Sequence, residues 1–317
     1  MLFRVRLDPV PEIDLVSIGE PLYELNQQPD GRYLPGFGGD TLNVAIAAAR
    51  LGASCAYVTR LGADMFGQEL LALMKRESVD ASGVLVDTDA PTGLYFVTHG
   101  SSGHAFIYRR KGSAASLIRP SDLKPDQIRS ARFVHASGIS LAISDSAADT
   151  VAEAIAIAKA AGRKVSFDTN FRPRLWPAGQ ALALIERAAA HADILKVSVE
   201  DSEGLMGVGN PREIADRFLA LGAKAVIVTL GPEGVVLATG RELDHVPGRR
   251  VASVDATGAG DAFTGALLAE CLRGAPLAEA ARFANAAAVL STLGRGAIAP
   301  LPTRVAVETA IRAEGPG

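Results

Sequence analysis

The chain has 317 residues, 48% of them hydrophobic, and a net charge of −3 with both signs scattered along it. This length suits one large α/β domain with room for a small accessory element, and the charge gives no indication of nucleic acid binding. The sequence also lacks an apolar run of membrane-spanning length, a signal-peptide core and the cysteines for a disulfide framework. We therefore expect a cytoplasmic protein without nucleic acid or membrane partners.

The first predicted strand covers residues 13–18, and residues 1–12 are expected to lie outside it. Polar residues dominate from 21 to 39, where Asp30-Gly31 is a typical hairpin turn. This stretch predicts a short β excursion away from the main sheet.

A glycine-rich run, Gly36-Phe37-Gly38-Gly39, precedes a helical pattern at residues 44–51. One interpretation is purely structural, with Asp40 or Thr41 capping the helix. The other is a binding turn in which Asp40 and Asn43 meet a ligand. The residues alone leave both open.

Residues 56–61 and 84–86 are predicted strands, with a helix at 68–77 between them. Residues 92–108 alternate as a hairpin does, around a turn at 100–103. Together with residues 21–39, this hairpin predicts a small antiparallel sheet that covers a ligand site.

The second half continues the alternation, which predicts a parallel sheet covered on both faces. Its expected strands are 133–136, 165–167, 194–199, 225–230 and 235–238, and its clearest helices are 145–161 and 280–293. Asp168, Asn170 and Arg172 follow the strand at 165–167, at the edge where open α/β sheets bind ligands.

The stretch S-V-D-A-T-G-A-G-D-A-F-T-G-A-L-L begins at Ser253. Residues 251–254 suggest the end of a strand, and a glycine turn then opens a helix from Asp261, which makes an anion site. A carboxylate at a helix N-terminus is stabilised as the anion, so Asp261 is expected to be ionised at neutral pH and able to accept a hydroxyl proton. The simpler alternative is a capped strand–turn–helix joint. The stretch is neither a P-loop, because no G-K-S/T follows, nor a dinucleotide fingerprint, because Phe263 occupies the third glycine position.

The motif D-A-T-G-A-G-D-A-F-T-G-A-L resembles the second signature of the ribokinase-like (PfkB) sugar kinases, and Gly-Gly-x-x-x-Asn at 38–43 resembles the first. The resemblance extends from about residue 16 to 299. It implies a three-layer α/β/α domain with a mainly parallel sheet, spanning residues 1–317, and a β lid from about 20–40 and 91–115. It also implies a homodimer or higher homo-oligomer assembled through the lid.

The resemblance assigns roles to residues on both sides of the motif. Asp261 is the catalytic base, and the amides of Gly258, Ala259 and Gly260 form the anion hole. The residues implied on the sugar side are Gly38, Gly39, Asp40, Asn43 and Asp255. Those implied around ATP and Mg²⁺ are Asp168, Asn170, Lys196, Ser198, Thr229, Gly231, Gly234, Gly258 and Gly260, with Asn285 and Ala288 beside the adenine. Many relatives hold a monovalent cation such as K⁺ near Asp255 and Thr257.

The acceptor sugar is suggested by Tyr95, the spacing Tyr108-x-Arg110 and Arg172, which are similar to the 2-keto-3-deoxygluconate kinases of this family. The carboxylate of such a sugar calls for guanidinium and phenolic donors. The implied reaction is ATP-dependent phosphorylation of the terminal hydroxyl, giving 2-keto-3-deoxy-6-phosphogluconate. Fructokinase is the alternative, followed by ribokinase or a nucleoside kinase. A non-catalytic sugar-binding relative would be expected to lack Asp261.

Overall fold

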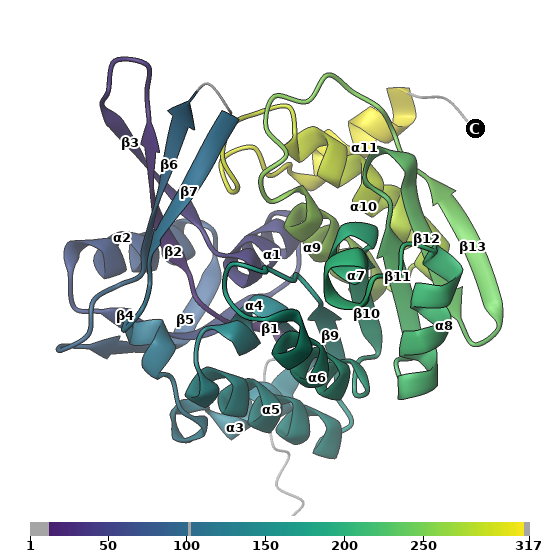
Figure 1. Cartoon of the computed structure of the whole chain (residues 1–317), viewed down its shortest axis with the longest axis horizontal. Coiled ribbons are helices and arrows are strands. Elements are labelled where there is room, and N and C mark those ends of the chain that lie inside the picture. The colour runs from purple at the N-terminus through teal and green to yellow at the C-terminus, as the bar shows by residue number, and fades with distance from the viewer. Residues whose placement is uncertain (1–12, 101–102, 314–317) are drawn as a thin grey trace, which may run out of the picture.

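The computed structural model describes residues 13–100 and 103–313, and a nine-stranded sheet runs through the middle of this part of the chain (Figure 1). Seven neighbouring strands are parallel, and β12 and β13 add an antiparallel edge. In spatial order the strands are β13 (Glu242–Pro247), β12 (Gly234–Thr239), β11 (Ala225–Thr229), β10 (Ile194–Ser198), β9 (Lys164–Asp168), β8 (Ala131–Ser137), β1 (Ile13–Ile18), β4 (Cys55–Gly62) and β5 (Val79–Asp87).

Helices cover both faces of this sheet, and each face has its own hydrophobic core. Successive residues of a strand point to opposite faces, so Leu15 and Tyr57 join one core while Val16 and Val58 join the other. The first core packs against α1 (Asp40–Arg50), α2 (Met65–Arg76), α9 (Ala259–Leu272), α10 (Leu277–Ser291) and α11 (Arg304–Ala313). The second packs against α3 (Pro125–Ser130), α4 (Gly138–Ala142), α5 (Asp145–Ala160), α6 (Ala178–Ala189), α7 (Val199–Met206) and α8 (Pro211–Leu221). The predicted three-layer α/β/α fold is confirmed.

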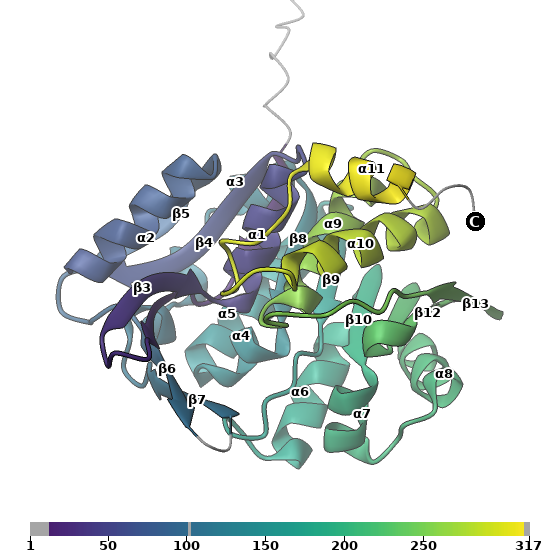
Figure 2. The ribbon, with the colours of Figure 1, turned by 90° about the horizontal axis from the view of Figure 1, so that it is seen from above.

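A small sheet projects beside α1 and α2 (Figures 1 and 2). Its order is β3 (Tyr33–Gly38), β2 (Leu22–Gln27), β6 (Leu94–Gly100) and β7 (Gly103–Arg109). Both predicted hairpins form and are antiparallel as expected, but they join each other through β2 and β6, which pair in parallel. Strands β2 and β6 follow β1 and β5, which are parallel, so both leave the main sheet from the same edge and run in the same direction.

Around the two glycine turns, three predictions differ from the structure. No strand forms at residues 251–254, because the N–H groups of Val254 and Asp255 bond to the carbonyl of Thr292, at the end of α10, instead of a neighbouring strand. Helix α9 begins at Ala259 instead of Asp261, and α1 begins at residue 40 instead of 44. The predictions for residues 1–12 and for the tip of the turn at 100–103 lie outside the described residues. Within the described ranges, no helix has the length and apolarity that a membrane crossing requires.

Candidate active site

Asp261 lies in the first turn of α9, where Gly258 in a left-handed conformation (φ +76°) turns the chain into the helix. The side chain is buried, and its Oδ2 accepts a hydrogen bond of 2.8 Å from Nδ2 of Asn43 on α1. The other polar atom of that amide, Oδ1 of Asn43, is buried and has no hydrogen-bond partner among the residues that the structure describes. The pair therefore presents a carboxylate and an unused acceptor side by side.

Close packing of α1 against α9 brings these two side chains together. At Gly265, a Cβ atom would lie 2.6 Å from the Cβ of Ala47 and 2.7 Å from the carbonyl oxygen of Val44. Both distances are far below van der Waals contact, so only glycine fits at this crossing. Gly265, which belongs to the same sequence motif as Asp261, thus sets the distance between the helices.

Burial controls the protonation of Asp261. It raises the pKa of this carboxyl to about 7, with a further contribution from the negative charge of Asp40, while the Asn43 hydrogen bond and the positive charge of Lys196 act in the opposite direction. The sequence-based expectation of a carboxylate fully ionised at neutral pH was wrong, because desolvation outweighs the helix N-terminus. A pKa near the operating pH suits a general base.

Unpaired amides and a lysine lie beside Asp261. The N–H groups of Gly260 and Asp261 make no hydrogen bond to any part of the chain that the structure describes, and Gly260 is exposed. The Nζ of Lys196 would be 3.4 Å from a Cβ placed on Gly260, and it forms a buried ion pair of 2.7 Å with Asp168. Amides at a helix N-terminus together with a nearby ammonium group form a binding site for a phosphoryl group.

Asp40, the first residue of α1, connects the start of that helix to two strands of the main sheet. The residue that caps α1 is Gly39, which has no side chain to bond with, so the structural interpretation in which Asp40 or Thr41 caps the helix does not hold. The Asp40 carboxylate instead accepts hydrogen bonds from Ser137 at the end of β8 and from Nδ2 of Asn170 (2.9 Å), just past β9. Its pKa is raised, mainly by burial.

The small sheet contributes Tyr95 and Tyr108, whose rings stack with centroids 5.8 Å apart. The Tyr95 hydroxyl donates a hydrogen bond to the buried carboxylate of Glu24, and a Cβ on Gly38 would be only 2.6 Å from that hydroxyl. The guanidinium of Arg110 lies 5.8 Å from the Tyr108 ring and pairs with the buried Glu20.

Beyond Tyr108 lies a group of positive charges. Burial raises the pKa of the Tyr108 phenol, while the charges of Arg110, Arg172 and Arg174 lower it. The guanidinium of Arg172 is half exposed, donates to the carbonyl of Phe171 at 3.0 Å and lies 3.8 Å from Asp201. Asp201 is buried and accepts a 2.8 Å hydrogen bond from Thr169.

Comparison with known proteins identifies this arrangement. The model of the pfkB family carbohydrate kinases matches residues 12–304. The chain belongs to the pfkB family of carbohydrate kinases. It is 37% identical to a 2-dehydro-3-deoxygluconokinase of Thermoproteus tenax, over 95% of each protein. It is also 37% identical to a probable fructokinase-4 of Arabidopsis thaliana, over 94% of this chain and 96% of the relative.

A solved structure agrees with these relatives. The fructokinase from Xylella fastidiosa with bound ATP superposes with a TM-score of 0.90 at 28% identity, covering 96% of this chain and all of that one. The chain therefore belongs to a family of enzymes that phosphorylate sugars. The 2-dehydro-3-deoxygluconokinase and the probable fructokinase are equally identical to this chain but act, by their names, on different sugars.

The expected nucleotide-side residues of this pfkB kinase lie at the ends of successive strands. Thr229 ends β11, and Gly231 and Gly234 bracket the turn into β12, which is the hairpin that the sequence allowed. Ser198 ends β10 and caps α7 by accepting from the N–H of Asp201. Farther along, Nδ2 of Asn285 on α10 donates to the carbonyl of Pro247 at 3.1 Å, and Ala288 follows one turn later.

Asp255 joins two loops next to α9. Its Oδ1 accepts from the N–H of Thr257 and its Oδ2 from that of Gly296, both at 2.9 Å. These loops border a cleft of about 1100 Å³ that extends to Glu24 and Phe37 of the small sheet.

Three residues of the site were missed by reasoning from the sequence: Glu20, Glu24 and Arg174. The two glutamates lie four residues apart in G-E-P-L-Y-E-L, on the same face of the chain as the buried Leu22. Residues two or four positions apart in a strand share one face, so this spacing could have predicted that both glutamates lie on the buried face with Leu22. Arg174 carried none, because its relevance depends on the fold of the loop after β9.

Proposed function

We propose that this pfkB kinase transfers the γ-phosphoryl group of ATP to the terminal hydroxyl of 2-keto-3-deoxygluconate, giving 2-keto-3-deoxy-6-phosphogluconate and ADP. The single observation that supports the acidic sugar best is the position of the Arg110 guanidinium, 5.8 Å from the centre of the Tyr108 ring, where the charges of Arg172 and Arg174 also lower the pKa of that phenol. A guanidinium group matches the geometry of a carboxylate and is never neutral in a protein.

In the proposed reaction, Asp261 takes the proton of the sugar hydroxyl. The oxygen of that hydroxyl bonds to the γ-phosphorus, and the bond between this phosphorus and the departing ADP oxygen breaks. The free N–H groups of Gly260 and Asp261 and the ammonium of Lys196 stabilise the charge on the transferring group. Asn43 orients Asp261 through Nδ2, and its unpaired Oδ1 is available to a second sugar hydroxyl.

Mg²⁺, bound together with ATP, would neutralise part of the charge of the phosphates. No cluster of three or more potential metal ligands occurs in the described residues, and this fits an ion that takes one or two carboxylates together with phosphates and water. Asp168 and Asp201, at the same edge of the sheet as Asp261, are the proposed carboxylates. For a monovalent cation, the loops held by Asp255 and Thr257 are the proposed place.

Fructokinase remains the second candidate, and the Glu24–Tyr95 hydrogen bond favours it. A phenol has one proton, and Tyr95 donates that proton to Glu24. The two groups therefore offer acceptors to the sugar, which suits a hydroxyl-rich neutral sugar better than the substrate carboxylate that Tyr95 was expected to meet.

We also propose a homodimer in which the outer faces of two small sheets pack together. Tyr33 and Ile107 on this face are 40% and 45% exposed, and Phe96 lies between them against the Tyr33 ring. Light scattering should give twice the chain mass for the native protein, and Ile107→Asp should give the monomer. A native monomer at micromolar concentration would contradict the dimer.

Substitution of Arg110 tests the assignment of the sugar. Arg110→Ala should reduce kcat/KM for 2-keto-3-deoxygluconate at least about tenfold more than for fructose, because loss of a hydrogen-bonded charge pair costs about 1.5–3 kcal/mol. The phosphorus NMR spectrum of the product should show coupling to a terminal CH₂ group. Equal losses for both sugars would argue against a carboxylate ligand at Arg110.

A further inference from the structure

The side chain of Glu20 is completely buried between the two sheets, just after β1. Its Oε2 accepts a 2.6 Å hydrogen bond from Nε of Arg110, whose Nη2 also contacts it, and its Oε1 accepts a 2.5 Å bond from the hydroxyl of Ser113. Gly93 leaves room for this carboxylate, since a Cβ there would be 2.6 Å from Oε1. Both oxygens of this buried carboxylate are therefore paired, in the short connection between β1 and β2. Burying a charge is costly even when it is paired, so this arrangement requires an explanation.

We propose that Glu20 is a positioning residue that fixes the orientation of Arg110, so that the guanidinium meets the substrate as half of a buried ion pair. This inference rests on the role of Arg110 in the proposed function. The guanidinium is planar and rigid, so holding Nε and Nη2 against one carboxylate also fixes Nη1. Within the described ranges Nη1 makes no hydrogen bond, and the buried Nη2 contacts Glu20 without making a hydrogen bond of its own, which leaves donors for a ligand.

The surrounding charges explain why Arg110 needs such a partner. Arg110 acts on the protonation of Asp40, whose pKa it lowers, and Asp40 in turn raises the pKa of Glu20. If Glu20 lost its charge, Asp40 would be the competing carboxylate for Arg110. Glu20 thus keeps the guanidinium of Arg110 in one orientation.

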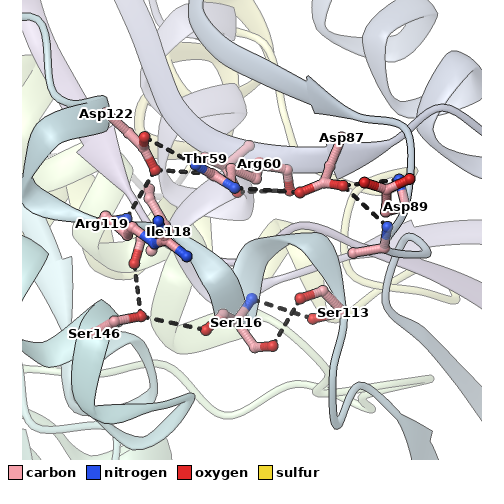
Figure 3. A network of polar contacts seen from close by, with 11 residues as sticks. Thr59, Arg60, Asp87, Asp89, Ser113, Ser116, Ile118, Arg119, Asp122 and Ser146 are labelled. Carbon is pink, nitrogen blue, oxygen red and sulfur yellow. Dashed lines mark hydrogen bonds and ion pairs between the residues drawn. The ribbon is translucent and has the colours of Figure 1, made fainter.

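Ser113, which donates a hydrogen bond to Glu20, belongs to a segment that other residues of the chain hold in place. Figure 3 shows the segment that carries Ser113, in which Ser116 bonds back to Ser113 and Ser146 donates to the carbonyl of Ile118 at 2.7 Å. Farther along the segment, Arg60 holds Asp122 through two hydrogen bonds of 2.7 and 2.9 Å and reaches Asp87 at 3.2 Å (Figure 3). Ser113 is therefore fixed to the edge of the main sheet, and Glu20 with it.

A double-mutant cycle separates positioning from simple structural support. Glu20→Gln keeps the volume of the side chain and removes its charge. We expect it to raise the KM for 2-keto-3-deoxygluconate at least about tenfold, with the KM for ATP and kcat changed by less than about twofold. In an Arg110→Ala background, Glu20→Gln should have almost no further effect on the sugar KM, because a residue that acts through Arg110 cannot act without it. Glu20→Asp, which retains the charge, should recover part of the loss.

The matched control is Glu77→Gln, which removes one carboxylate from the bidentate Arg50–Glu77 pair, with both hydrogen bonds at 2.8 Å. It should lower the melting temperature and leave the sugar KM unchanged. Independent, multiplicative effects of Glu20→Gln and Arg110→Ala, or a lower melting temperature with an unchanged sugar KM for Glu20→Gln, would overturn the inference. If Arg110→Ala alone left the sugar KM unchanged, the premise taken from the proposed function would fail, and the inference with it.

Discussion

The amide of Asn43 donates a hydrogen bond of 2.8 Å to the carboxylate of Asp261, across 218 positions of sequence. This contact joins the first turns of α1 and α9, which directly follow Gly39 and Gly258. It gives the proposed base a fixed orientation and lowers the pKa that burial raises. The following predictions start from this pair.

Asp261→Asn should lower kcat by orders of magnitude with a modest change in the KM of the sugar. The substituted amide keeps the size of the side chain but cannot accept the hydroxyl proton. Steady-state kinetics with saturating ATP measures the effect. A variant that keeps more than about a tenth of the rate, within about 1.4 kcal/mol of the native barrier, would remove Asp261 as the base.

The pH dependence should follow the protonation of Asp261. A base must be deprotonated to act, so kcat/KM should rise with pH and then level off, and the midpoint of the rise should lie near the Asp261 pKa of about 7. Asn43→Ala removes a hydrogen bond that favours the charged carboxylate, so the pKa and the midpoint should move to higher pH. A midpoint that stays at the native value in Asn43→Ala, or moves lower, would show that Asn43 does not control the protonation of Asp261.

Gly265→Ala should force α9 away from α1. The added methyl group would overlap Ala47 and the Val44 carbonyl, and overpacking of this kind costs about 1–3 kcal/mol. We expect a lower melting temperature together with a reduced kcat, since Asn43 and Asp261 would separate. The matched control is Gly179→Ala in α6, where a Cβ would have no atom within 4 Å. It should leave kcat unchanged and stability the same or slightly higher, and equal effects of the two variants would contradict the packing argument.

Tyr95→Phe should destabilise the protein because the buried Glu24 loses the hydroxyl that donates to it. An unsatisfied buried partner costs about 1–3 kcal/mol, and more when it is charged. Tyr33→Phe is the control, since the Tyr33 hydroxyl makes no hydrogen bond within the described part of the chain and phenylalanine keeps the ring contact with Phe96. Chemical denaturation of the two variants should show a clear loss of unfolding free energy for Tyr95→Phe and little change for Tyr33→Phe. Similar values would mean that the Glu24–Tyr95 bond contributes little.

Apolar runs and glycine turns predicted the main sheet, because the spacing of buried residues is a local property of the chain. The motif around Asp261 was equally local. The raised pKa of Asp261 was not predictable, since it depends on burial by residues distant in sequence. The same holds for the Glu20–Arg110 pair, which joins the ends of β1 and β7, and for the parallel pairing of β2 with β6. A strand was wrongly expected at residues 251–254, because the N–H groups of Val254 and Asp255 bond to Thr292 at the end of α10 instead.

The central claim is that this pfkB kinase acts on an acidic sugar, and a substrate panel tests it most directly. ATP-dependent ADP release would be measured with 2-keto-3-deoxygluconate, 2-keto-3-deoxygalactonate, fructose, ribose and adenosine. We predict that kcat/KM for the keto-deoxy acids exceeds that for the neutral compounds by about a hundredfold, equivalent to about 2.7 kcal/mol. A preference for fructose would keep Asp261 as the base but contradict the assignment of Tyr108, Arg110 and Arg172 to a substrate carboxylate.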